Sequence, residues 1–181
     1  LPDSYMSVVE SLKHACLQNK VNLDLQWIDA DNYDAEDISN LDGVVVPGGF
    51  GVRGIEGKIS AIQYLRENKI PFLGICLGLQ CAVIEYARNV CGINEANSSE
   101  FSQNTKDFVI DLLPNQDLDK DDVGASMRLG TYPCKIAKNT ITSEIYKDEV
   151  IYERHRHRYE VNNKYREVLE KNGLIFSGLS P

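Results

Sequence analysis

The stretch that most constrains the fold is Pro71 to Gln80, PFLGICLGLQ, in which a short apolar run changes into a helical pattern. Beyond the break, apolar residues recur at helical spacing, at Leu79, Ala82, Val83, Tyr86 and Ala87. The join itself is a G-x-C-x-G sequence, Gly74 to Gly78. Small residues two before and two after a central position let a strand turn sharply into a helix. The sequence therefore predicts a strand, a tight turn with a strained central residue, and a helix.

The central residue of this turn, Cys76, is a candidate nucleophile. Its setting has the layout of a nucleophile elbow, with cysteine in place of the usual serine. A thiol at a helix N-terminus meets the positive end of the helix dipole, which lowers its pKa, and free N–H groups that can hold an oxyanion. The alternative is a buried cysteine in an ordinary strand-to-helix turn, because free cysteines are among the most buried residues.

A glycine-rich segment follows another apolar run. Residues 41–46 end in a β-branched stretch typical of a parallel strand covered on both faces, and PGGFGVRG follows at 47–54. Its N–H groups could hold a phosphate or an oxyanion, or the segment could be a plain flexible turn. It is not a phosphate-binding P-loop, because no Lys-Ser or Lys-Thr pair follows the glycines. Carboxyl ends of parallel strands share one sheet edge, so we expect this loop and Cys76 to lie at that edge.

The order of the predicted elements indicates an α/β fold, an open, mostly parallel sheet with flanking helices. A length of 181 residues is that of one domain. Helices are predicted at 3–19, 56–67, 77–90, 139–147 and 162–172, and strands at 21–28, 41–46, 71–75, 152–161 and 174–177. Residues 127–136 are predicted to pair as antiparallel strands, with Gly130 at a bend.

Composition excludes several functional classes. A net charge of -8 and a pI near 4.9 disfavour nonspecific binding of nucleic acid or anionic membranes. Five cysteines without a CxxC pair indicate reduced thiols in a cytoplasmic protein, with neither a disulfide framework nor a zinc site. No apolar run approaches the ~18 residues of a membrane-spanning helix. The acidic stretch NQDLDKDD at 115–122 is expected to be a solvated loop, because it lacks the glycine and closing glutamate of a calcium loop.

Residues 152–161, YERHRHRYEV, concentrate basic side chains. In an extended chain three arginines would share one face, and His155, His157 and Tyr159 the other. Three interpretations compete: a nucleic-acid patch, a two-histidine metal site, or a strand with one arginine directed at a carboxylate. The first fits the net charge badly, and the second lacks further ligands at suitable spacing. Arginine suits bidentate capture of a carboxylate.

Five segments together resemble the glutaminase domain of the CTP synthase family, which belongs to the class I (triad) glutamine amidotransferases. They are PGGFGVRG, GICLGLQ, NEANSSEF, MRLGTYPC and ERHRHRYEVNN. The G-x-C-x-G sequence alone indicates only the amidotransferase superfamily, whereas NEANSSEF and ERHRHRYEVN narrow the resemblance to CTP synthases. It covers essentially the whole chain, 1–181, and implies a flavodoxin-like, three-layer fold.

The resemblance implies a role for each matching residue. Cys76 would attack the side-chain amide of L-glutamine and form a γ-glutamyl thioester. Backbone N–H groups of Gly49 and Leu77 would form the oxyanion hole. The other substrate-binding positions would be Phe50, Gln80, Glu100, Arg158 and Tyr159, with Phe50 and Tyr159 as walls. Charge suggests Glu100 for the substrate ammonium and Arg158 for its α-carboxylate.

The resemblance also implies a larger enzyme, of which 1–181 is expected to be a fragment. That enzyme would convert UTP to CTP with ATP and Mg²⁺, with GTP as activator, as a cytoplasmic homotetramer. The synthetase domain of the same polypeptide, absent here, would receive the ammonia. No cofactor or metal is expected in this domain.

The family's His-Pro-Glu segment, which supplies the catalytic histidine and glutamate, has no counterpart among these residues. The three histidines are His14, expected at the surface, and His155 and His157, expected to have a positional role. A cysteine without its base retains only residual nucleophilicity, so this fragment alone is expected to hydrolyse little glutamine.

Two alternative functions remain open from the sequence. One is a glutaminase partner of another triad amidotransferase, such as those for carbamoyl phosphate, GMP or anthranilate, against which RHRHRYEVN argues. The other is a nonenzymatic glutamine-binding or assembly module. The retained Cys76 argues against such a module, and the missing His-Glu pair favours it.

Overall fold

The computed structural model describes residues 2–102, 104–112 and 127–180. The chain divides into two compact units, residues 1–82 and 83–181, and the division falls within helix α4. The predicted acidic loop at 115–122 lies outside the described residues. No described helix combines the length and the apolar character needed to cross a bilayer.

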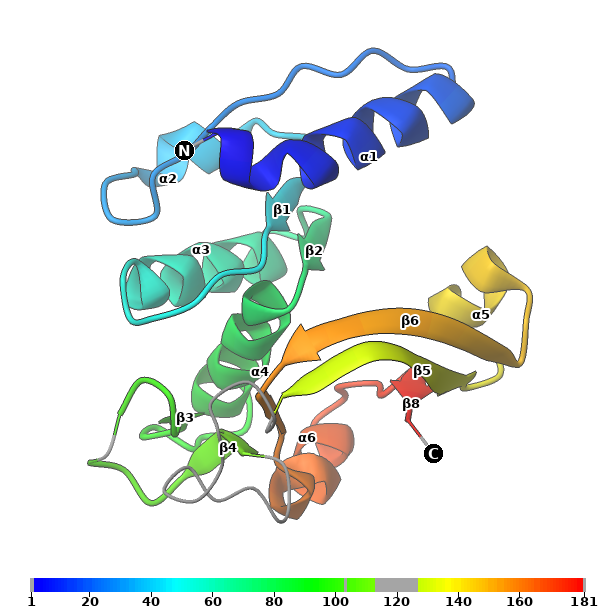
Figure 1. Ribbon diagram of the computed structural model, residues 1–181. Helices are drawn as coiled ribbons and strands as arrows, with labels where there is room; N and C mark the ends of the chain where they lie inside the picture. Colours follow the sequence, from blue (N-terminus) through cyan, green and yellow to red (C-terminus); the bar gives the residue numbers. More distant parts are fainter. Residues whose placement is uncertain (1, 103, 113–126, 181) are drawn as a thin grey trace. The chain divides into compact units, whose positions relative to one another are not determined.

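The first unit is built around a pair of parallel strands. Its elements are η1 (Pro2–Tyr5), α1 (Met6–Gln18), α2 (Ala35–Ser39), β1 (Val44–Val46), α3 (Ile55–Glu67), β2 (Phe72–Gly74) and the start of α4 (Leu77–Asn89). Strands β1 and β2 lie side by side (Figure 1) in a parallel register that pairs Val44 with Phe72 and Val46 with Gly74. The predicted parallel pairing of these two apolar runs is therefore confirmed.

Helix α3 follows the glycine-rich loop, as predicted. Its buried residues are Ile55, Ile59, Ile62 and Leu65, spaced so that they share one face. The residue before the helix, Gly54, has a φ of 67°, which glycine adopts at little cost. The buried stripe stabilises α3 because a helix of this length is marginal without tertiary packing.

A close backbone approach joins α3 to the segment before α2. A Cβ atom on Gly57 would overlap the carbonyl oxygen of Ala30. The Gly57 carbonyl in turn accepts a hydrogen bond of 3.1 Å from the Tyr33 hydroxyl. Glycine at position 57 therefore allows the contact between the 29–34 segment and α3.

The predicted strand at 21–28 is wrong. These residues are irregular and pair with no strand among the described residues. Val21 and Trp27, two of the alternating apolar residues, are exposed. Alternation alone does not form a strand, because the backbone groups also need a partner strand.

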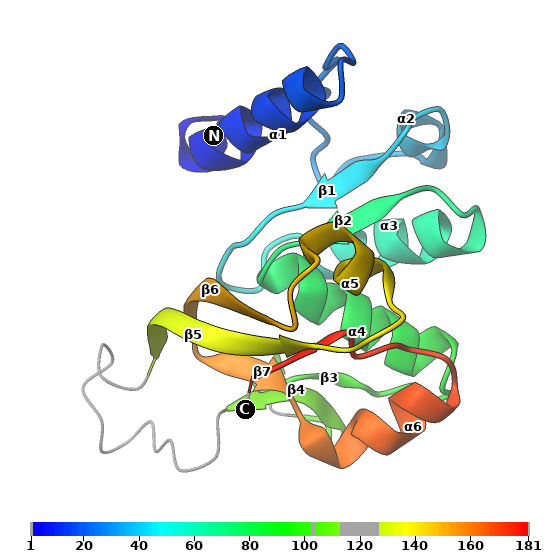
Figure 2. The ribbon, with the colours of Figure 1, turned by 90° about the vertical axis from the view of Figure 1, so that its right-hand side faces the viewer.

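The second unit contains two three-stranded sheets and two short helices. Its elements are β3 (Asn97–Ser98), β4 (Phe108–Leu112), β5 (Arg128–Ile136), α5 (Ile141–Tyr146), β6 (Val150–His157), β7 (Tyr159–Val161), η2 (Asn163–Tyr165), α6 (Arg166–Lys171) and β8 (Gly178–Leu179). One sheet has the strand order β3-β4-β7 (Figure 2) and the other β6-β5-β8 (Figure 1). The pair β3–β4 is parallel, and the pairs β4–β7, β5–β6 and β5–β8 are antiparallel.

Two strand predictions in this unit need correction. Residues 128–136 do not pair with one another but form one strand, β5, whose register with β6 runs from Arg128 opposite His157 to Lys135 opposite Val150. Gly130 has a φ of 106° inside this strand instead of making a bend between two strands. The last strand lies at 178–179 instead of 174–177, because pairing with the end of β5 sets its position.

The predicted helices of this unit are confirmed with shorter bounds. Thr140 caps α5: its hydroxyl oxygen accepts a hydrogen bond of 3.2 Å from the Ser143 amide. The predicted helix at 162–172 is η2 followed by α6. The Tyr86 hydroxyl in α4 donates a 2.6 Å hydrogen bond to the Asn172 carbonyl, which ties the end of α6 to α4.

We expect Gly57→Ala to destabilise the chain by about 2 kcal/mol, because the new methyl group must displace the Ala30 carbonyl. The measurement is the free energy of unfolding in urea. Ser60→Ala, an exposed position of the same helix, is the matched control and should change that energy by less than about 0.5 kcal/mol. Equal stability of the two variants would contradict the assigned close approach.

Candidate active site

Cys76 occupies the turn between β2 and α4 and has a φ of 53°. A left-handed conformation is costly for a residue with a side chain, so the predicted strain at this position is confirmed. Three backbone hydrogen bonds hold the turn. The Ile75 amide donates to the Val46 carbonyl at 2.9 Å, the Gly78 amide to the Ile75 carbonyl at 3.0 Å, and the Gln80 amide to the Cys76 carbonyl at 3.1 Å.

Both glycines of the G-x-C-x-G sequence are required by close backbone contacts. A Cβ atom on Gly74 would lie 2.6 Å from the Gly78 carbonyl carbon. A Cβ atom on Gly78 would overlap the carbonyl oxygen of Val46 in β1. The start of α4 therefore approaches both strands at backbone distance, and Cys76 stands where β2 meets the helix.

The glycine-rich loop after β1 lies against this turn. A Cβ atom on Gly48 would lie 3.4 Å from the Cβ of Cys76 and 4.0 Å from its Sγ. One on Gly49 would lie 3.2 Å from Cδ2 of Leu77. The predicted meeting of the loop and Cys76 at one sheet edge is confirmed. Because residues 48 and 49 are glycines, the loop backbone can approach Cys76 and Leu77 closely, as an oxyanion site requires.

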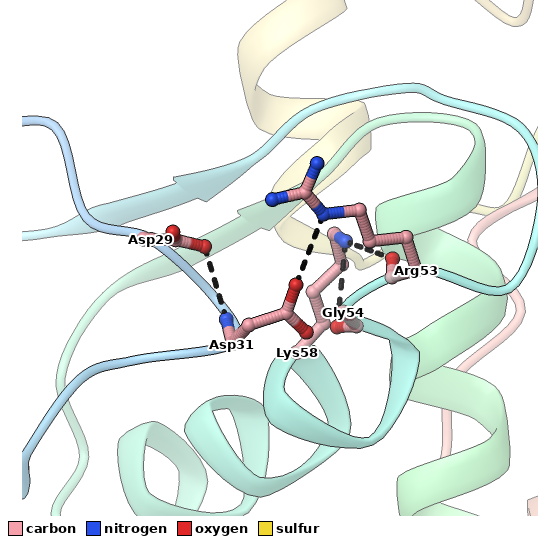
Figure 3. Close-up of polar contacts among 5 residues, drawn as sticks. All are labelled: Asp29, Asp31, Arg53, Gly54 and Lys58. Carbon is pink, nitrogen blue, oxygen red and sulfur yellow. Dashed lines mark hydrogen bonds and ion pairs between the residues drawn. The ribbon is translucent and has the colours of Figure 1, made fainter.

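The far end of the loop is anchored by charged side chains (Figure 3). The Arg53 Nε donates to Oδ2 of Asp31 at 3.1 Å, and the Asp31 amide donates to Oδ1 of Asp29 at 3.1 Å. The Lys58 ammonium donates to the carbonyls of Arg53, at 3.2 Å, and Gly54, at 3.4 Å. The Arg53–Asp31 pair is exposed and contributes little to stability.

The remaining predicted residues of this unit differ in exposure. Leu77 and Gln80, in the first turn of α4, are buried, whereas the Phe50 side chain is 71% exposed. The burial of Leu77 and Gln80 fixes the first turn of α4 next to Cys76. Phe50 is available for contact at the tip of the loop.

The other three predicted residues, Glu100, Arg158 and Tyr159, lie in the second unit and are brought near one another. Glu100 follows β3, and its amide donates to the Ser98 hydroxyl at 3.1 Å. Tyr159 begins β7, opposite Leu112 of β4. Arg158 is the residue between β6 and β7.

The pKa of the Tyr159 hydroxyl depends on its burial and on the charged side chains near it. Burial raises the pKa of its hydroxyl above the usual value near 10, and the Glu100 carboxylate raises the pKa further. The Arg158 guanidinium lowers the pKa and so opposes both effects. The carboxylates of Glu100 and Asp111 and the guanidinium of Arg158 therefore all act on this one phenol. A carboxylate together with a guanidinium suits an α-amino acid, which carries both an ammonium and a carboxylate.

Sequence reasoning missed the residues that support Glu100. Ser98 is fully buried, and the Ser99 hydroxyl donates a 2.7 Å hydrogen bond to Oδ1 of Asp111 in β4. The available signal was the pair of serines in NEANSSEF, because serine hydroxyls bind nearby backbone groups in turns. The position of Asp111 depends on β4, which the sequence did not predict.

The histidines do not assemble a metal site in the described part of the chain. No group of three or more histidine, cysteine or acidic side chains there is placed to hold a metal ion. His14 is exposed on α1, as expected. His155 and His157 contact each other, with 2.7 Å between Nδ1 of His155 and Nε2 of His157.

Comparison with known proteins agrees with the geometry. The family described as Glutamine amidotransferase class-I matches residues 1–181. The chain is 58% identical to the CTP synthase of Caldanaerobacter subterraneus subsp. tengcongensis, with all of the chain and 34% of that protein aligned. It is 55% identical to the CTP synthase of Geobacillus kaustophilus, with all of the chain and 35% of that protein aligned. The chain thus spans about a third of the length of these curated relatives.

A solved structure is similar over nearly the whole chain. The glutaminase domain of Trypanosoma brucei CTPS, with bound acivicin, matches with a TM-score of 0.88 and 40% sequence identity. The match covers 99% of this chain and 70% of the other. This likeness, together with the parallel β1–β2 pair and the flanking helices, confirms the predicted α/β amidotransferase fold.

We expect Cys76→Gly to be more stable than Cys76→Ala by about 0.5 to 1 kcal/mol, because glycine adopts a φ of 53° without the penalty that alanine carries. Urea unfolding of both variants is the measurement. The matched control is Ala15→Gly in α1, an exposed helical position, where glycine should instead cost about 1 kcal/mol. A less stable Cys76→Gly would show that the turn is not strained.

Proposed function

The chain belongs to the class I glutamine amidotransferase family, and from that premise we propose that it is the glutaminase domain of a CTP synthase. Cys76 would hydrolyse L-glutamine and so supply ammonia for the amination of UTP to CTP. The observation that carries this proposal is the strained Cys76 at the start of α4, with the glycine-rich loop packed against its turn.

The proposed reaction uses Cys76 as a nucleophile. Its thiolate adds to the side-chain carbonyl carbon of glutamine, and the carbonyl oxygen takes the negative charge. Backbone N–H groups of Gly49 and Leu77 stabilise that charge, a contribution commonly worth a few kcal/mol. The C–N bond then breaks as the nitrogen takes a proton, so ammonia leaves and a γ-glutamyl thioester remains. Water adds to the thioester and releases glutamate and the free thiol.

Substrate recognition is assigned to the charged residues of the second unit. Glu100 holds the substrate ammonium and Arg158 its α-carboxylate, and the guanidinium can form two parallel hydrogen bonds to that group. Supporting this assignment, both charges act on the same phenol, Tyr159. Gln80 and Phe50 complete the proposed contacts.

The general base is not assigned to any histidine of this chain. His14 is exposed on α1, and His155 and His157 are engaged with each other and with Glu160. A cysteine nucleophile needs a base to activate the thiol and later the water. We propose that residues of the longer protein supply it, and that this chain alone turns over little glutamine.

The remaining proposals concern the longer protein. Its synthetase domain, on the same polypeptide, would use the ammonia with ATP and Mg²⁺, and GTP would activate the glutaminase. A homotetramer in the cytoplasm is the proposed state, and five cysteines without a disulfide in this chain are compatible with a reducing compartment. The support is the similarity to CTP synthases over the whole chain.

In the full-length protein, Cys76→Ala should lower the rate of CTP formation from glutamine by at least about a thousandfold, because the thioester cannot form. CTP formation from added ammonium chloride should be unchanged, because free ammonia bypasses the glutaminase reaction. Nucleotide analysis of both reactions makes the measurement. Cys81→Ala, which removes a neighbouring buried thiol, is the matched control and should retain glutamine-dependent activity. Retained glutamine-dependent activity in Cys76→Ala would overturn the proposed function.

A further inference from the structure

Arg158 stands where the chain passes from one sheet of the second unit to the other. Strand β6 ends at His157 and is paired with β5, while β7 begins at Tyr159 and is paired with β4. The direction of the Arg158 side chain therefore depends on how these two sheets are held at the crossing. The sequence pattern, a continuous alternation from 152 to 161, gave no sign of this break.

A closed ring of five side chains joins the strands on either side of the crossing. We call it the crossing ring; its members are Arg128 and Tyr132 of β5, His155 and His157 of β6, and Glu160 of β7. Arg128 Nη1 lies 3.0 Å from Oε1 of Glu160, in the geometry of an ion pair but not of an aligned hydrogen bond. His157 Nδ1 lies 3.8 Å from the same oxygen.

The other side of the ring is formed by aromatic contacts. The rings of His155 and His157 share the 2.7 Å contact between Nδ1 and Nε2, in which one nitrogen must donate. The rings of His155 and Tyr132 form a T-shaped pair, with 5.5 Å between centroids. The Arg128 guanidinium lies over the same Tyr132 ring, 5.0 Å from its centroid, and this contact completes the crossing ring.

The charges of the ring depend on one another. Burial lowers the pKa of His157 below its usual 6.5, and the Arg128 guanidinium lowers it further, whereas a backbone hydrogen bond at Tyr159 raises it. Burial also lowers the pKa of His155, and His157 and Arg128 add to the effect while Glu160 and Glu153 oppose it. Burial raises the pKa of Glu160, whereas Arg128 and His155 lower it. At neutral pH both imidazoles are therefore neutral, and Glu160 pairs with Arg128.

We propose that the crossing ring positions Arg158, so that Glu160 and His157 act through Arg158 on the capture of the substrate α-carboxylate. Glu160 is the only acidic member of the ring, and it holds β7 to Arg128 of β5. Loss of that carboxylate frees the β6–β7 crossing to rotate, and Arg158 is carried on that crossing. This inference rests on the proposed function, because it needs Arg158 to bind glutamine.

The first test is Glu160→Gln in the full-length enzyme. We expect the KM for glutamine to rise about 3- to 30-fold with a smaller change in kcat, the range expected when one member of a coupled charge network is removed. Ammonia-dependent CTP formation should be unchanged. Glu153→Gln makes the same chemical change on exposed β6, outside the ring, and should leave the KM unchanged. An unchanged KM in Glu160→Gln would overturn the inference.

A double-mutant cycle separates positioning from general damage to the fold. In an Arg158→Lys background, which already weakens glutamine binding, Glu160→Gln should add little to the KM, because both changes disrupt the same interaction. Multiplicative effects would show that Glu160 acts independently of Arg158 and would overturn the inference. If Glu160→Gln does not fold, His157→Gln is measured in the same cycle and judged by the same outcomes.

The outcomes also separate this inference from the proposed function. Retained glutamine-dependent activity in Cys76→Ala would contradict the glutaminase assignment itself. An Arg158→Lys variant with an unchanged KM for glutamine would contradict the role of Arg158. If Arg158→Lys raises the KM and Glu160→Gln does not, only the crossing ring loses its assigned role.

The ring also predicts a pH dependence of glutamine binding. Since the pKa values of His155 and His157 lie below 6.5, these groups take up protons only as the pH falls below that value. Protonated His157 adds a second cation beside Arg128 and competes for Glu160, so affinity for glutamine should fall as the pH is lowered below 6.5. The two histidines should also make the fold less stable as the pH falls below 6.5, because their lowered pKa values mean that they bind more protons in the unfolded chain than in the folded chain. The raised pKa of Glu160 has the opposite sign.

Calorimetric titration of glutamine into full-length Cys76→Ala enzyme measures this effect without the thiol and without turnover. We expect the dissociation constant to rise as the pH is lowered below 6.5, and His157→Gln in the same background to flatten that rise. Any change in the charge of glutamine itself is common to both proteins and cancels in the comparison. A pH dependence equally steep in both proteins would exclude His157 as its source.

Discussion

The contact between Gly78 and the Val46 carbonyl is the constraint on which the catalytic half of the structure depends. It brings the start of α4 to backbone distance from β1, while the Ile75 amide binds the same carbonyl oxygen at 2.9 Å. With the helix held this close, the chain joins β2 to α4 through a single left-handed residue, Cys76. The strain at the nucleophile thus follows from packing around it, and glycine at 74 and 78 is what permits that packing.

Sequence reasoning succeeded where the information is local. The elbow, the glycine-rich loop and α3 depend on residues within a few positions of one another, and each was predicted with nearly its observed bounds. It failed where a strand depends on a distant partner. The alternating segment at 21–28 has no partner strand among the described residues, and the break at Arg158 is set by pairing with β5 on one side and β4 on the other.

In the candidate site, too, residues set by local sequence could be predicted and residues set by distant strands could not. Cys76 could be identified as a candidate from a short motif, because its turn depends on close backbone contacts that the glycines at 74 and 78 permit. The assignment of Gly49 to the oxyanion hole came from resemblance. Glu100 and Arg158 could be identified only through resemblance, because their positions are fixed by Ser98, Asp111 and the crossing ring, which belong to strands far apart in the sequence. Residue type alone does not distinguish Arg158 from Arg154 and Arg156, which are exposed on β6.

The position of Arg158 between two sheets favours the role in carboxylate recognition that we propose for it. A long arginine side chain on an exposed strand loses considerable rotamer entropy when it binds a carboxylate, and this loss weakens binding. At the crossing, the backbone on each side is already fixed by a different sheet, and the partly buried ion pair between Arg128 and Glu160 restrains both. Part of the entropy lost in ordering Arg158 is therefore lost during folding and not during binding. The same arrangement makes recognition sensitive to the ring's protonation, because the groups that fix the crossing include two imidazoles whose neutral state burial favours.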